Sequence, residues 1–197
     1  NELEFYSIII PDGPLTSRLQ HISIGDNLIL NPKATGTLVL DSLLPGKRLF
    51  LFASGTGIAP FISLIRDPEI YEKFEKIILI HTCREVKDLN YGKSIVETIG
   101  KDSLIGEYAD RVFYYPTVTR ETFHTKGRIT DLLKTGQFFQ DLQLTPISRD
   151  TDRAMICGSL GLNKDIKTFL ETSGLKEGAR NRPAEFVLEK AFAVGLN

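Results

Sequence analysis

The feature that most constrains the fold is a strand-length apolar run that ends in two glycines. Residues 49–53 are continuously apolar, Gly55 and Gly57 follow, and residues 58–66 carry apolar side chains at helical spacing. This pattern predicts a strand that turns sharply into a helix, with Pro60 in the first helical turn, where its missing N–H would have no intrahelical partner. Such a turn offers backbone N–H groups to an anion, most often a phosphate. The alternative is an ordinary strand-to-helix turn in which glycine serves only the backbone conformation.

Four further apolar runs alternate with helical segments after this turn. The expected strands, after 49–53, are 77–80, 112–115, 154–157 and 186–188, and the expected helices, after 58–66, are 91–99, 128–135 and 162–172. Alternation of this kind predicts an α/β domain built on a five-stranded parallel sheet with helices on both faces. Ligands of such domains bind beyond the carboxyl ends of the strands, so the residues at those ends are the candidates for a site.

The chain before residue 47 has a different pattern. We expect short strands at 3–10, 28–30 and 37–40 and a helix at 15–22. Three strands cannot close a β-barrel, so this region either packs as an open fragment or belongs to a barrel with strands before residue 1. The pattern divides the chain into segments 1–46 and 47–197.

Arginines follow two neighbouring strands of the expected sheet. Arg84 ends the segment after strand 77–80, Arg120 follows strand 112–115, and Arg128 begins the next helix. An arginine after the second strand of a nucleotide-binding unit suits the 2′-phosphate of NADP, whereas an acidic residue would suit NAD. Together the three could clamp a phosphate through bidentate contacts. The alternative is three unrelated surface charges.

The fourth expected strand ends in Cys157-Gly158-Ser159. Gly158 would let a planar ring approach the backbone. Cys157 has no base placed beside it by the sequence, and a lone cysteine at a strand end is more often a small buried apolar group. Phe192, near the end of the chain, either stacks on an aromatic ligand or covers the core.

Composition limits the partners and the compartment. The formal net charge is −1, so the molecule as a whole does not attract nucleic acid. No apolar run approaches the roughly 18 residues of a membrane span, and the first residues do not resemble a signal peptide. Two widely separated cysteines, Cys83 and Cys157, form no disulfide framework, which favours a reducing cytoplasm.

Several motifs in one order carry a family resemblance over Leu3 to Phe192. They are Pro11-Asp12-Gly13-Pro14-Leu15-Thr16-Ser17-Arg18-Leu19, Gly55-Thr56-Gly57-Ile58-Ala59-Pro60-Phe61, Thr82-Cys83-Arg84, Cys157-Gly158-Ser159 and Val187-Leu188-Glu189-Lys190-Ala191-Phe192. In this order and spacing the chain resembles the bacterial-type ferredoxin/flavodoxin–NADP(+) reductases. The resemblance implies an FAD-binding antiparallel β-barrel domain, here the incomplete segment 1–46, followed by a Rossmann-like NADP-binding domain, 47–197, whose tail reaches the flavin.

The resemblance also implies roles for individual residues. Cys157 and Glu189 match the catalytic pair near the nicotinamide and the flavin. The cofactor-binding positions are Pro14, Leu15, Thr16 and Ser17 for the flavin, Gly55, Thr56, Gly57, Gly158 and Ser159 around the nucleotide, Arg84, Arg120 and Arg128 for the 2′-phosphate, and Ala191 and Phe192 in the tail. No metal site is implied.

One family motif is not found in this sequence. The Arg-x-Tyr-Ser flavin motif lies before the strand that matches Leu3–Ile10, and Tyr6-Ser7 does not replace it. Together with the three expected strands, this predicts that about the first quarter of a family member precedes Asn1.

The resemblance implies a cytoplasmic, monomeric oxidoreductase that uses FAD and moves electrons between NADP(H) and ferredoxin or flavodoxin, with no nucleic-acid or membrane partner. Lys47, Arg48 and Lys190 are candidate docking charges for an acidic carrier, or simply solvated surface. One alternative is the reductase component of an oxygenase, although two distant cysteines do not suit its iron–sulfur domain. The other is a non-catalytic NADP-binding module.

Overall fold

The structure is a computed structural model that describes residues 3–31 and 36–190, with no description of the Lys190 side chain. It consists of two units, Asn1–Gly36 and Thr37–Asn197. The functional boundary expected between residues 46 and 47 remains a prediction.

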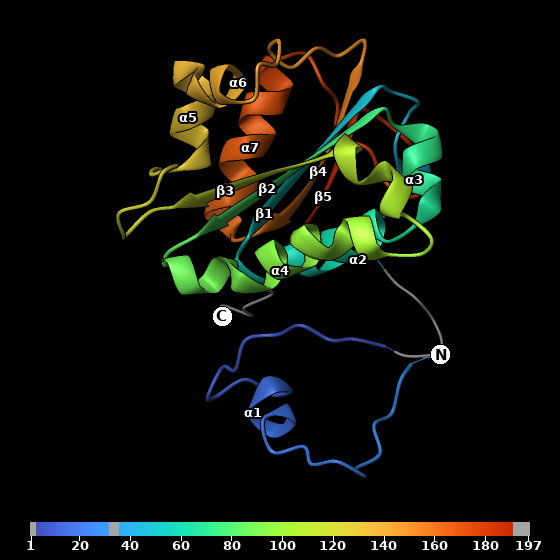
Figure 1. Cartoon of the computed structure of the whole chain (residues 1–197), viewed down its shortest axis with the longest axis vertical. Helices are drawn as coiled ribbons and strands as arrows, with labels where there is room; N and C mark the ends of the chain where they lie inside the picture. The colour runs from blue at the N-terminus through green and yellow to red at the C-terminus, as the bar shows by residue number, and fades with distance from the viewer. Residues whose placement is uncertain (1–2, 32–35, 191–197) are drawn as a thin grey trace. The chain divides into compact units, whose positions relative to one another are not determined.

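The larger unit is built on a five-stranded parallel sheet (Figure 1). The strands are β1 (Arg48–Ser54), β2 (Lys76–Cys83), β3 (Val112–Val118), β4 (Asp152–Gly158) and β5 (Phe186–Lys190). Their order is β3-β2-β1-β4-β5, so the chain reverses direction across the sheet between β1 and β4. The predicted α/β class and its five parallel strands are therefore confirmed.

Helices cover both faces of this sheet (Figure 1). One face carries α5 (Ile129–Thr135), α6 (Gln137–Asp141) and α7 (Leu160–Thr172), and the other carries α2 (Ala59–Ile65) and α4 (Asn90–Thr98), with α3 (Pro68–Lys73) beside α2. The predicted helices all form, and Pro60 lies in the first turn of α2 as expected. The short helices α3 and α6 were not predicted. The 3-10 helices are η1 (Leu40–Ser42), η2 (Gly55–Ile58), η3 (Val86–Leu89), η4 (Ile99–Lys101) and η5 (Gly106–Arg111).

Alternation along the strands gives each face of the sheet its own core. Phe50 and Phe52 of β1 pack with buried side chains of α5, α6 and α7, including Leu133, Phe138 and Ile166. The residues between them point to the opposite face because successive side chains of a strand alternate. Both sets are almost fully buried. The apolar runs are continuous because both faces of the sheet are covered.

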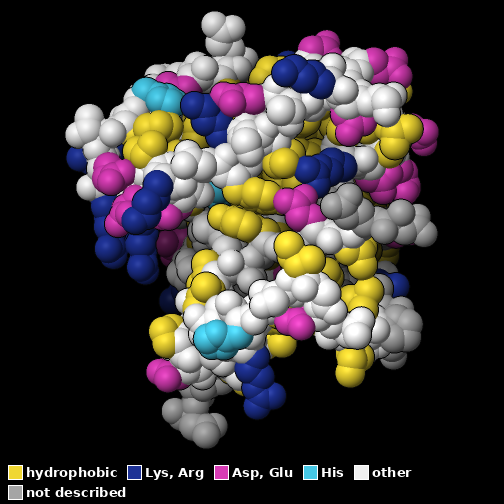
Figure 2. Space-filling view, turned by 60° about the horizontal axis from the view of Figure 1, so that its bottom comes forward, with side chains coloured by type: hydrophobic (Ala, Val, Ile, Leu, Met, Phe, Trp, Pro, Cys, Tyr) yellow, Lys and Arg dark blue, Asp and Glu magenta, His cyan; other side chains and the backbone are white. Residues whose placement is uncertain are grey.

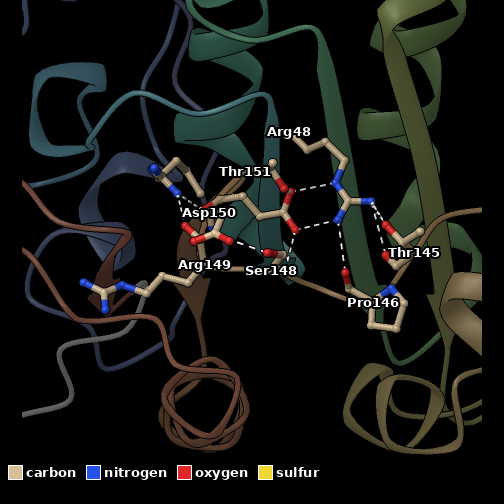
Figure 3. Close-up of polar contacts among 9 residues, drawn as sticks. Arg48, Thr145, Pro146, Ser148, Arg149, Asp150 and Thr151 are labelled. Carbon is tan, nitrogen blue, oxygen red and sulfur yellow. Dashed lines mark hydrogen bonds and ion pairs between the residues drawn. The ribbon is translucent and has the colours of Figure 1, made fainter.

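A buried ion pair joins β1 and β4 at their amino ends (Figure 3). Arg48 donates from Nε and Nη2 to the two carboxylate oxygens of Asp152, at 2.7 and 2.5 Å, and Asp152 is 0% exposed. The same guanidinium donates to the carbonyl oxygens of Thr145 and Pro146, both at 3.2 Å. Arg48 is thus committed to the fold, and its suggested role as a docking charge is wrong.

The strands expected before residue 47 do not form. In residues 3–31 and 36–47 no residue lies in a strand, and residues 40–42 form η1 instead. The expected helix at 15–22 shortens to α1 (Thr16–Leu19). Many apolar side chains here are exposed, among them Phe5 at 70% and Ile29 at 103%. The alternating pattern alone therefore does not produce a strand, because a strand also needs a partner for its backbone groups.

Candidate functional site

The carboxyl ends of β1 and β4 meet at the point where the strand order reverses. A Cβ added to Gly57 would overlap the carbonyl oxygen of Cys157, and one added to Gly158 would lie 2.8 Å from a methyl carbon of Leu162. The N–H of Ser159 donates to Ser54 Oγ at 2.9 Å, which ties the two strand ends together. Glycine is required here because the two backbones approach too closely for any side chain.

The turn after β1 is open above Gly55. Gly55 has φ +54°, and a Cβ placed on it would meet nothing within 4 Å. Thr56 is half-buried and follows within η2. The turn is therefore unobstructed at the Cα of Gly55, which suits close approach of a ligand.

Arg84 and Arg120 extend from neighbouring strands of the same sheet edge. Both are exposed, and the N–H of Arg120 donates to the carbonyl oxygen of Arg84 at 3.0 Å. The loop after β3 returns to the strand through a hydrogen bond from the N–H of Gly127 to the carbonyl oxygen of Val118 at 3.0 Å. The exposed Arg128 directly follows and begins α5. The fold thus places all three arginines after the carboxyl ends of β2 and β3.

Carboxylates join the loops that carry these arginines. Glu121 accepts from the N–H of Val86 at 2.6 Å, linking the loop after β3 to the loop after β2. Glu85 pairs with Lys87 at 2.7 Å. The Lys87 hydrogen bond and charge, with a smaller contribution from Arg120, lower the pKa of Glu85. The loops are therefore linked to each other, while the arginine side chains face solvent.

Cys157 and Glu189 lie opposite each other in the β4–β5 register. Burial and then the charge of Glu189 raise the pKa of the Cys157 thiol to about 11, so the thiol is neutral at pH 7. A neutral buried thiol is a packing and contact group rather than a nucleophile. Both cysteines, Cys83 and Cys157, are buried free thiols.

Three partners of this region were not expected from the sequence. The backbone N–H and Oγ1 of Thr37 both donate to Glu189 Oε1, the latter at 3.1 Å. Asn163 of α7 donates from Nδ2 to the carbonyl oxygen of Glu189 at 2.7 Å. His81 of β2 lies 3.0 Å from the carbonyl oxygen of Gly55 through Nε2. The contacts of Thr37 and Asn163 with Glu189 could not be predicted from local sequence patterns, because each residue lies far from Glu189 in the chain.

The flavin residues expected in the smaller unit lie around α1. Thr16 Oγ1 accepts from the N–H of Ile10 at 3.1 Å, and Ser17 Oγ donates to the carbonyl oxygen of Gly13. Pro14 and Leu15 precede these hydroxyls, and Leu15 is 63% exposed. Ala191 and Phe192 lie outside the described residues.

Comparisons with known proteins agree with this geometry. Residues 51–168 match the model of the oxidoreductase NAD-binding domain. The flavodoxin/ferredoxin–NADP reductase of Rhodobacter capsulatus is 59% identical over 192 residues, which are 97% of this chain and 71% of that protein. The ferredoxin–NADP reductase of Azotobacter vinelandii is 50% identical over 192 residues, covering 96% of this chain and 74% of that protein.

A solved structure extends the comparison to bound cofactors. The ferredoxin NADP+ reductase from Neisseria gonorrhoeae, with bound FAD and NADP, superposes with a TM-score of 0.80 at 27% identity. The match covers 93% of this chain and 72% of that one.

Fold and site together define the nucleotide-binding domain of an oxidoreductase: a parallel sheet with a glycine turn at the reversal of strand order and arginines beyond its carboxyl edge. At the level of family, the chain belongs to the ferredoxin/flavodoxin–NADP reductases, which are enzymes of NADP-linked electron transfer. None of the described helices is both long and apolar enough to cross a membrane.

Proposed function

We propose that this chain transfers electrons between NADP(H) and a small one-electron carrier, ferredoxin or flavodoxin, with FAD as the intermediate redox group. The observation that carries the proposal is the placement of Arg84, Arg120 and Arg128 after the ends of neighbouring strands. Beside them the glycine turn is open at Gly55. Family membership supports the same activity.

The arginines would bind the 2′-phosphate of the nucleotide. Guanidinium groups stay charged at any working pH and bind phosphate oxygens bidentately. Arg84 and Arg120 are joined by a backbone hydrogen bond of 3.0 Å, so their Cα positions are fixed before a ligand arrives. Binding at this remote phosphate can then support placement of the nicotinamide, whose own contacts are weaker.

Residues at the β1–β4 junction would receive the nicotinamide half. Gly57 and Gly158 let the two backbones lie close together, and Ser159 is tied to the end of β1 through Ser54 Oγ. Cys157 supplies a neutral contact surface at pH 7. Glu189, held by Thr37, supplies the one carboxylate of this group and would set the local charge where hydride moves.

The chemistry of Thr16 and Ser17 fits a flavin pyrophosphate, because each hydroxyl could turn its O–H from its present acceptor, the carbonyl oxygen of Ile10 or of Gly13, to a phosphate oxygen. The exposed side chain of Leu15 fits an apolar ring. FAD, when bound, supplies the conversion between a two-electron hydride and single electrons. Ala191 and Phe192 complete this proposed set.

Charge on the surface is mixed in sign. Figure 2 shows Lys and Arg side chains interspersed with Asp and Glu side chains on the face that it displays. Lys47 is exposed and lies 3.9 Å from Glu75. With a formal net charge of −1, attraction of an acidic carrier must come from a local basic cluster rather than from the molecule as a whole. A monomer in the cytoplasm is part of this proposal.

Nucleotide titration tests the proposed phosphate clamp. Arg84→Ala should weaken NADP+ binding by roughly 10- to 100-fold, the range for a lost charged hydrogen bond, and change NAD+ binding little. Lys134→Ala, which removes the same charge from an exposed position late in α5, is the matched control. Equal losses for NADP+ and NAD+ would reject a phosphate role for Arg84.

Absorbance spectra test the flavin part separately. The purified chain is mixed with FAD, freed of excess, and measured for retained flavin bands. Retained flavin together with NADPH-dependent reduction of ferredoxin or flavodoxin supports the proposed activity. NADP+ binding without retained flavin would instead favour the non-catalytic nucleotide-binding module. The reductase component of an oxygenase has no support among the relatives named above.

A further inference from the structure

His81 is a fully buried polar side chain inside an apolar strand. It follows Ile77–Ile80 in β2, is 0% exposed, and pairs in register with Ala53 near the end of β1. Its Nε2 lies 3.0 Å from the carbonyl oxygen of Gly55, and its Nδ1 lies 3.1 Å from the hydroxyl of Tyr114. A core position would ordinarily take another apolar residue, so these two contacts call for an explanation.

The contacts fix where the proton of the ring lies. A carbonyl oxygen can only accept, so Nε2 carries the proton and donates to Gly55, while Nδ1 accepts from the hydroxyl of Tyr114. Burial lowers the pKa of His81 to about 4, against smaller opposing effects of the Gly55 hydrogen bond and the Asp88 charge. The ring is therefore neutral at pH 7 and held as one tautomer.

The bond to Gly55 also determines the direction of the next N–H. The Gly55–Thr56 peptide is planar, so its C=O and its N–H point to opposite sides. Holding the Gly55 carbonyl toward His81 therefore turns the Thr56 N–H away from the α4 side of the sheet. Gly55 has φ +54° and begins the 3-10 helix η2, so the His81 hydrogen bond adds to the backbone geometry that this helix imposes on the peptide.

The ring itself is held firmly by α4. A Cβ added to Gly92 would lie 3.0 Å from His81 Nδ1 and 3.1 Å from the Tyr114 hydroxyl, so the helix backbone packs directly on both groups. The thiol of Cys83 lies 3.3 Å from Nε2 and is a further close neighbour of the ring. His81 is thus a rigid donor aimed at the first peptide of η2.

We propose that His81 is a positioning residue for the nucleotide: by holding the Gly55–Thr56 peptide, it orients Thr56 toward the dinucleotide at the β1–β4 junction. This inference rests on the proposed function, since it assumes that NADP(H) binds at that junction. His81 itself touches neither the nucleotide nor a reacting atom. It acts only through the peptide that it holds.

Two substitutions separate the hydrogen bond to Gly55 from core packing. In His81→Gln the amide nitrogen can take the place of Nε2 and still donate to Gly55. In His81→Asn the shorter amide reaches only the position of Nδ1. It can therefore keep the hydrogen bond with the Tyr114 hydroxyl but loses the one to the Gly55 carbonyl oxygen. Both place a neutral amide in the same buried site, and their folded fractions are matched by circular dichroism before binding is measured.

Calorimetric titrations of the full chain use two ligands. NADP+ spans the arginines and the turn, whereas adenosine 2′-monophosphate reports on the arginines alone. We expect His81→Asn to weaken NADP+ binding about tenfold, as for the loss of one well-formed hydrogen bond, and to leave adenosine 2′-monophosphate binding unchanged. His81→Gln should recover NADP+ binding to within about threefold of the wild type.

Several results would overturn the inference. Equal weakening by Asn and Gln, no weakening by Asn, or a parallel loss of adenosine 2′-monophosphate would each leave His81 with only a structural role. A wild-type chain that binds neither ligand would reject the proposed function and this inference with it.

The protonation of the wild-type ring gives a test that needs neither a variant nor a nucleotide. Long-range 15N–1H NMR spectra should show the proton of His81 on Nε2. A proton on Nδ1 would remove the donor to Gly55 and reject the positioning role even if NADP+ binds normally.

Discussion

Asp152→Ala should destabilise the larger unit strongly. The carboxylate is fully buried and accepts four hydrogen bonds: two from Arg48, one from the N–H of Ser148 at 2.7 Å, and one from Thr151 Oγ1 at 3.0 Å. Its removal leaves the Arg48 guanidinium, whose side chain is only 13% exposed, without a counter-charge. Breaking a buried ion pair from one side costs about 3–5 kcal/mol.

The remaining contacts of Arg48 narrow that range. The guanidinium keeps its hydrogen bonds to the carbonyl oxygens of Thr145 and Pro146, so part of its hydrogen-bonding capacity is still satisfied after the substitution. We therefore expect a loss near the lower end, about 3 kcal/mol, which corresponds to a fall in Tm of roughly 6–12 °C for a unit of this size. Asp150→Ala, which removes a neighbouring exposed carboxylate, is the control and should cost under about 0.5 kcal/mol.

Urea unfolding followed by circular dichroism measures the difference, and NADP+ titration of the folded variant checks that the site is intact. The ion pair lies at the amino end of β1, about 20 Å of strand away from the turn, so binding should not change. A loss for Asp152→Ala within about 0.5 kcal/mol of the Asp150→Ala control would refute the reasoning. In that case the pair would contribute no more than an exposed one.

Three further expectations follow from buried groups around the site. Gly57→Ala should cost roughly 1–3 kcal/mol, because its Cβ would overlap the Cys157 carbonyl, whereas Gly161→Ala, with open space in α7, should be neutral or stabilising by thermal unfolding. Because the pKa of His81 is lowered to about 4 in the fold, the unfolded state binds the extra proton from pH 6.5 downward. The free energy of unfolding should therefore rise by about 3 kcal/mol from pH 4 to 6.5, and His81→Gln should flatten that part of a pH series of urea titrations; an unchanged slope would contradict the assignment. Burial raises the pKa of Cys83 to about 12 and of Cys157 to about 11, so iodoacetamide at pH 7.5 should label both only after unfolding, as mass spectrometry would show.

The sheet was predictable because its strands are continuous apolar runs, but the strand ends were not. The run at 154–157 predicted a strand two residues shorter at its start than β4, which begins at Asp152. In a sequence, a charged residue before an apolar run indicates a loop. Asp152 can be buried in β4 because it pairs with Arg48 of β1, which lies far away in the chain. The same holds for His81, which directly follows an apolar run. Its position there was a signal, but the partner Gly55 could be known only from the fold.

In the segment before residue 37, the local pattern of apolar residues did not predict the structure correctly. Residues 3–10 and 28–30 are as rich in isoleucine and leucine as the strands of the sheet, yet none of these described residues lies in a strand, and Ile24 and Ile29 are fully exposed. Residues 49–53 form a strand because β2 and β4 flank them and pair with their backbone on both sides. A run of apolar residues therefore predicts which side chains a strand would bury. Whether the strand forms depends on neighbouring strands that can pair with its backbone. We therefore expect retention of FAD by this chain to depend on whether residues 3–30 acquire strand partners. A far-UV circular dichroism spectrum that gains strand signal when FAD is added would mean that the cofactor itself supplies enough contact to order them.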